Sequence, residues 1–110
     1  MDATAAAPHS ARWYPAGFAV APQFPGVAGR WDRSPHCAHG ASCIALYVIS
    51  QRGCPNGLYG EIDILSGGAV VSYTNDRLRS LRPGQIGHLV FNTYDPPPGA
   101  SPDLTKLNCY

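Results

Sequence analysis

The density of turn-forming residues is the feature that most constrains this chain. Glycine (12) and proline (11) together make up about a fifth of the 110 residues, and they recur between short apolar stretches. Proline lacks a backbone N–H and glycine loses the most backbone freedom on ordering, so this density argues against long helices. Short strands with turns about every eight to twelve residues are typical of an antiparallel sandwich. We therefore predict an all-β fold, an antiparallel immunoglobulin-like β-sandwich of about seven strands.

The apolar stretches indicate where the strands lie. The predicted extended segments are residues 17–21, 27–31, 44–49, 58–65, 69–74, 86–94 and 104–110. Residues 44–49 are continuously apolar, as expected of a strand that is covered on both faces. Residues 58–65 alternate between apolar and polar side chains, which indicates a half-buried strand. Ser-Gly-Gly at residues 66–68 predicts a tight hairpin turn, and residues 78–81 are predicted to form one helical turn.

The chain has four cysteines, an even number that in a short chain of low charge predicts two disulfides. Of the three pairings that four cysteines allow, we favour Cys37 with Cys43 and Cys54 with Cys109. The first pair closes a short loop, and the second ties an early strand end to the last strand. The chain-entropy model assigns about 2 kcal/mol to the short loop and about 4 kcal/mol to the long one. Disulfides predict an oxidising, extracytoplasmic location.

Charge and length limit the classes of function. Charged residues are 14% of the chain and the net charge is +1, which argues against a nucleic-acid-binding protein. No apolar run approaches the roughly 18 residues that a membrane span requires. The length suits a single core. We expect a flexible Ala/Pro-rich arm at residues 1–12 and a single β-sandwich domain at residues 13–110.

Potential metal ligands gather in one loop, where His36, Cys37, His39 and Cys43 lie within eight residues. A tetrahedral zinc site needs nitrogen or sulfur donors in a compact arrangement, but this spacing matches no common zinc motif. The side chains of adjacent residues also diverge. We therefore interpret the loop as a disulfide flanked by exposed histidines, and we expect no metal and no cofactor.

The candidates for catalysis are two carboxylates and one histidine in the predicted strands. Glu61 and Asp63 share one strand face, and paired carboxylates catalyse reactions when their environments separate their pKa values. With no pocket indicated, we interpret them as a solvated face, with His88 placed to pair with one of them across the sheet. The chain has no nucleophile elbow, phosphate-binding loop or dinucleotide motif. We expect that it is not an enzyme.

One turn combines an aromatic residue with basic ones. Arginines beside aromatic rings stack on sugars, bases or anionic polymers, although three positive charges are too few for strong polyanion binding. The candidate binding residues are Tyr73, Arg77, Arg79 and Arg82. A second aromatic group lies in the proline-rich N-terminal segment and is predicted to cover an open sheet edge, with an exposed partner patch as the alternative. Its members are Trp13, Tyr14, Phe18, Phe24 and Trp31.

Several stretches of the second half of the chain resemble a known type of domain. These are residues 54–59, 61–65, 70–71, 74–76, 81–85 and 104–110, the most specific being Leu-Arg-Pro-Gly-Gln at 81–85 and the terminal cysteine. Over residues 37–110 the chain resembles small immunoglobulin-like domains of exported or lipid-anchored actinobacterial proteins, in the style of the FxLYD domains. Residues 57–60 lack the Phe and the Asp of that motif. The resemblance implies a binding, spacer or accessory role outside the cytoplasm and no catalytic residues.

These observations lead to one expected function and one alternative. We expect a non-enzymatic extracytoplasmic binding or accessory module whose partner is another protein or a component of the cell envelope. The alternative is a structural assembly subunit, such as a decoration or adaptor protein on a viral or envelope surface, that docks through residues 1–12. Oligomeric state distinguishes the two, since the first predicts a monomer and the second a larger assembly.

Overall fold

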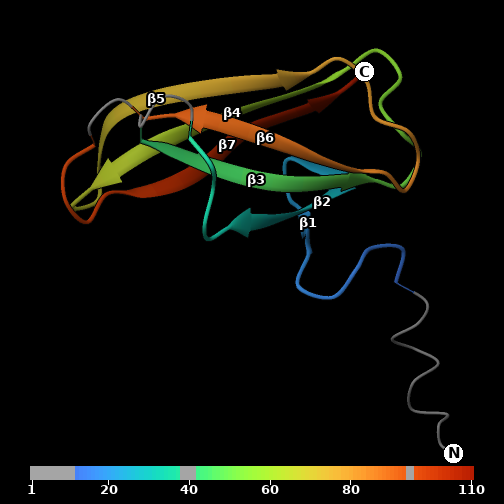
Figure 1. Ribbon diagram of the computed structural model, residues 1–110, viewed down its shortest axis with the longest axis horizontal. Helices are drawn as coiled ribbons and strands as arrows, with labels where there is room; N and C mark the ends of the chain where they lie inside the picture. The colour runs from blue at the N-terminus through green and yellow to red at the C-terminus, as the bar shows by residue number, and fades with distance from the viewer. Residues whose placement is uncertain (1–11, 38–41, 94–95) are drawn as a thin grey trace, which may run out of the picture.

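The computed structural model describes residues 12–37, 42–93 and 96–110, which form two antiparallel sheets (Figure 1). One sheet has the strand order β1-β2-β3-β6 and the other β5-β4-β7. The strands are β1 (Ala19–Ala21), β2 (Phe24–Asp32), β3 (Cys43–Ser50), β4 (Leu58–Ser66), β5 (Ala69–Leu78), β6 (Ile86–Asn92) and β7 (Ser101–Cys109). The predicted all-β sandwich of seven antiparallel strands is confirmed.

The chain crosses between the sheets three times, after β3, β5 and β6. Strands that follow one another in the sequence pair as β1 with β2, β2 with β3, and β4 with β5. An immunoglobulin constant domain has the same four-plus-three arrangement, but its larger sheet contains the first, second, fifth and fourth strands. The order of strands within the sheets is therefore different here.

The hairpin between β4 and β5 has the turn that its sequence predicts. Gly67 and Gly68 have φ angles of 60° and 84°, and Ser66 pairs with Ala69 across the turn. Positive φ at both central residues gives the turn whose twist matches the two strands, which explains the pair of glycines. The prediction of a helical turn at residues 78–81 is wrong. Strand β5 continues to Leu78 because its later residues pair with the first half of β4.

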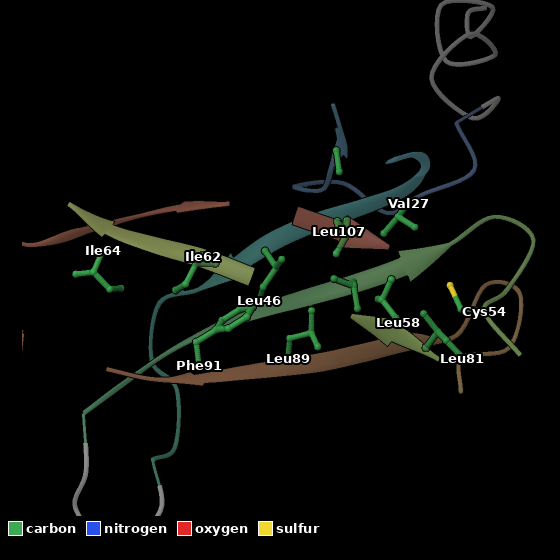
Figure 2. Close-up of a cluster of buried hydrophobic side chains, with 12 residues drawn as sticks. Val27, Leu46, Cys54, Leu58, Ile62, Ile64, Leu81, Leu89, Phe91 and Leu107 are labelled. Atoms are coloured by element: carbon green, nitrogen blue, oxygen red, sulfur yellow. The ribbon is translucent and has the colours of Figure 1, made fainter. Parts of the chain in front are cut away.

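The core fills the space between the sheets with side chains from both (Figure 2). The fully buried members include Leu58, Ile62 and Ile64 of β4, Val48 of β3, and Leu89 and Phe91 of β6. Gly60 allows β4 to approach β6, because a Cβ at this position would lie 2.9 Å from Leu89 Cδ1. The predicted alternation of β4 is confirmed, since its apolar face points into this core.

A second, smaller cluster covers the outer face of the four-stranded sheet. It consists of Phe18, Ala28 and Ile49, with Trp13 and Tyr14 packed against it. Strand β3 therefore contributes to apolar clusters on both of its faces, as its continuous apolar run predicts. The N-terminal aromatic residues were predicted to cover an open sheet edge, but Trp13, Tyr14 and Phe18 cover the outer face of the sheet, and Phe24 packs against the main core. Trp31 is described below.

Both predicted disulfides are confirmed. Cys37 pairs with Cys43 at a sequence separation of 6, and Cys54 pairs with Cys109 at a separation of 55. The second bond joins the end of β7 to the turn before β4, where Cys54 is fully buried. Two disulfides are consistent with an extracytoplasmic location. In the described ranges, no helix is long and apolar enough to cross a membrane.

Candidate binding groove

The sandwich is closed along one side and open along the other. On the closed side, β5 lies beside β6, and the Asp76 carboxylate accepts a hydrogen bond from the Val90 N–H at 2.8 Å. This bond satisfies a donor on the outer edge of β6. On the open side, β1 and β2 face β7, and the Gln23 side-chain amide donates to the Leu104 carbonyl at 2.6 Å. Between these strands lies a groove.

The groove has a volume of about 680 Å³, which is within the range of ligand-binding clefts. Its floor contains Gly29 of β2, Leu46 of β3 and Leu107 of β7. Its rim is formed by residues of β1, by the β1–β2 turn, by the end of β2 and by the start of β7. The remaining lining residues are Gly17, Ala19, Ala21, Pro22, Gln23, Arg30, Trp31, Arg33, Pro102, Asp103 and Leu104.

Trp31 is the large apolar side chain of this groove. Because side chains alternate along a strand, Trp31 lies on the same face of β2 as Val27 and Gly29, the face that points toward the core. Val27 is fully buried, yet Trp31 is 36% exposed. Its cross-strand partner Leu46 is only 4% exposed. Trp31 thus extends the apolar core into a groove that leaves it open to solvent.

The Arg30 guanidinium lies on the outer face of the four-stranded sheet, so Arg33 supplies the positive charge of the groove. Arg30 and Arg33 line it together with a single acidic residue, Asp103. The Arg30 guanidinium lies 4.7 Å from the ring centre of Tyr47 and 5.5 Å from that of Phe18, which holds it between two aromatic rings. Arg33 is exposed just beyond the end of β2, and the described residues give it no ion pair. Arg33 is therefore the residue of the groove that would pair with an anionic group of a ligand.

A polar cluster lies on the outer face of the four-stranded sheet. His88 Nε2 is 3.0 Å from Asp32 Oδ2, and the His88 ring stacks on Tyr47 with centres 4.5 Å apart. The Ser34 N–H donates to Asp32 at 3.0 Å, and this bond and His88 hold the pKa of Asp32 below its usual value. The cluster fixes the end of β2, and therefore the position of Trp31, against β3 and β6.

The prediction that His88 pairs with Glu61 or Asp63 is wrong. His88 points outward from one sheet, and these carboxylates point outward from the other, so the whole sandwich lies between them. The Tyr59 hydroxyl donates to Glu61 at 2.8 Å, and this bond raises the pKa of Tyr59. Glu61 and Asp63 are half-buried on an outer sheet face.

The predicted binding residues do not line the groove. Tyr73 and Arg77 lie on β5, and Arg79 and Arg82 follow in the connection to β6. All of them are exposed, and Tyr73 is 67% exposed. Their binding role stays a prediction. The same pattern, arginine beside an aromatic residue, also occurs at Arg30, Trp31 and Arg33. From the sequence, Trp31 was predicted to cover a sheet edge, with an exposed partner patch as the alternative, and no role was assigned to the two arginines.

The predicted metal-ligand loop is partly described. Cys37 and Cys43 are bonded to each other, so their sulfurs are not free thiolates, and His36 is exposed. His39 lies outside the described residues, as do residues 1–11 of the predicted arm.

Comparison with known proteins finds no family model, no curated protein and no solved structure that matches this chain.

Proposed function

We propose that the protein is a non-enzymatic, extracytoplasmic binding module that holds its ligand in the groove between β1–β2 and β7. The observation that carries this proposal is the exposure of Trp31 at a core-facing position of β2. Large aromatic side chains left open in a concave site are characteristic of binding surfaces, because covering them on binding removes apolar area from water.

The surroundings of Trp31 support this role. The groove places small apolar side chains beside Arg33 and the Gln23 amide, a combination that buries an apolar part of a ligand and orients a polar part. The disulfides support an oxidising compartment, where the partner would be another secreted protein or a component of the cell envelope.

NMR titration of the ¹⁵N-labelled protein tests the proposal. The probes are separate panels of short peptides and of cell-envelope oligosaccharides. We expect at least one probe to give saturable shift changes at Gly29, the Trp31 indole and Leu104. Trp31→Ala should abolish these changes, whereas Tyr73→Ala, which removes an exposed aromatic side chain elsewhere, should retain them. Saturable changes confined to Arg77 and Arg79, or none with any probe, would contradict a binding role for the groove.

A further inference from the structure

We infer that the ligand of the groove is an extended segment of a partner protein, which adds as a strand beside β7 and directs an acidic side chain toward Arg33. This inference rests on the proposed function and specifies its ligand. Three observations carry it: the free edge of β7, the hydrogen bond that already occupies part of this edge, and the charge of the groove.

The first observation is that β7 is an edge strand. Among the described residues it pairs with β4 on one side and with no strand on the other, and this free side borders the groove. The facing edge strand β1 contains only Ala19–Ala21, and its register shifts between Val20 and Ala21. The two sheets are therefore left apart here. A free strand edge presents unpaired N–H and C=O groups, which is the requirement for adding a strand.

The second observation is the hydrogen bond from the Gln23 amide to the Leu104 carbonyl, at 2.6 Å. It shows that this carbonyl points away from β4 and accepts an amide N–H from the groove side, as it would from an added strand. In an antiparallel strand the N–H and C=O of one residue face the same side, so the Leu104 N–H also faces the groove. Pro102 has no N–H to offer. Pairing would therefore be centred on Leu104.

The third observation concerns side chains. Groove residues of β7 extend from Pro102 to Leu107, which at about 3.4 Å per residue accommodates roughly five residues of an added strand. Alternate side chains of that strand would face the apolar floor at Leu46 and beside Trp31. Arg33 is exposed at the rim and has no ion pair among the described residues, so an acidic side chain of the added strand complements it. An oligosaccharide would also stack on Trp31, but the alanines and prolines of the wall offer few partners for its hydroxyl groups.

The test begins with phage-displayed random peptides of twelve residues, selected on the wild-type protein. We expect the enriched sequences to alternate apolar and polar residues and to contain Asp or Glu. Affinities of the synthetic peptides are then measured by tryptophan fluorescence. The chain has two tryptophans, so Trp13→Phe leaves Trp31 as the only reporter.

Two matched pairs of variants test separately whether the peptide adds as a strand at Leu104 and whether it pairs with the charge of Arg33. The first pair is Leu104→Pro and Leu104→Ala. Both substitutions remove the leucine side chain, but only proline also removes the backbone N–H. We therefore expect the proline variant to bind the peptide at least about tenfold more weakly than the alanine variant. Arg33→Glu should weaken binding by about tenfold, and Arg79→Glu, at an exposed site outside the groove, should leave it unchanged. Circular dichroism and thermal melting verify that each variant is folded. Peptides N-methylated at alternate backbone positions lack the N–H donors of an added strand, so their binding to the wild-type protein tests strand addition without any substitution in the protein.

Three other outcomes of these experiments would overturn the inference. Equal affinity of the two Leu104 variants, together with full binding of the N-methylated peptides, would exclude strand addition. Saturable binding of an oligosaccharide in the groove without any peptide binding would overturn this inference and leave the proposed function standing. Preferential binding of a peptide with the sequence of residues 1–11 would identify a second copy of this chain as the occupant, in place of a partner protein.

Discussion

The edge strands are covered to different extents on the two sides of the sandwich. On the closed side, β5 lies against β6, and the Asp76 carboxylate takes up the Val90 N–H. On the open side, the Gln23 side chain is hydrogen-bonded to the free edge of β7, and Trp31 stays exposed in the groove. Edge strands expose hydrogen-bonding groups, so a chain that seals one edge and leaves the other open keeps a surface for a partner. The difference separates a closed side from the open side on which the proposed function places the ligand.

The largest expected contrast comes from truncating one aromatic side chain on each side. Phe91→Ala should lower the free energy of unfolding by about 3–5 kcal/mol, because Phe91 is fully buried and its loss leaves a cavity. Trp31→Ala should cost about 1 kcal/mol, since its surroundings are already open to solvent. Urea unfolding measures both. Equal losses would mean that Trp31 is a core residue and that the groove is not a separate surface.

The disulfide at the end of β7 should have the next largest effect. In the part of the chain that the structure describes, β7 pairs with a strand on one side only, so the bond to Cys54 holds an end that would otherwise fray. Replacing Cys54 and Cys109 with serine should cost about 2–5 kcal/mol, and replacing Cys37 and Cys43 should cost less because their loop is shorter. Chemical denaturation of the two double mutants provides the comparison. A larger loss for the Cys37–Cys43 pair would show that β7 does not depend on its disulfide.

The hydrogen bond of the closed side should contribute a smaller amount. Asp76→Ala leaves the Val90 N–H without its acceptor and should cost about 1–2 kcal/mol, whereas Asp76→Asn retains an oxygen acceptor and should cost less. Amide hydrogen exchange at Val90 should accelerate in the alanine variant. An unchanged exchange rate would indicate that packing alone closes this side.

The smallest expected effect concerns acid stability at the end of β2. The Ser34 N–H and His88 lower the folded-state pKa of Asp32. Its stabilising contribution is therefore fully present above the unfolded pKa of 3.8 and is lost as the pH falls through the lower folded-state pKa. Asp32→Asn should remove this part of the pH dependence. Urea unfolding between pH 2 and pH 6 measures the difference. An identical pH profile for the variant would show that the Asp32 carboxylate does not secure this end of β2.

Local chemistry made much of the fold predictable from the sequence. The alternation at β4, the continuous apolar run at β3 and the glycine pair at residues 67–68 each depend on neighbours within a few residues, and each prediction is confirmed. The disulfide pairing was chosen on loop length and strand position, and it is also confirmed. The helical turn at residues 78–81 was wrong because distant pairing with β4 decided the conformation of that stretch.

What the sequence by itself determined is the set of strands, their turns and the faces that they bury, because these follow from the two-residue period of a strand and from turn chemistry. What only the tertiary structure decided is which strands are neighbours. The pairing of β3 with β6 placed His88 beside Asp32 and away from Glu61, and the edge position of β7 left Trp31 uncovered. Trp31 and Val27 occupy equivalent positions in the alternation of β2, yet one is exposed and the other buried. That difference arises from the opposite sheet, because a groove lies between its edge strand β7 and Trp31, and no local pattern contains it.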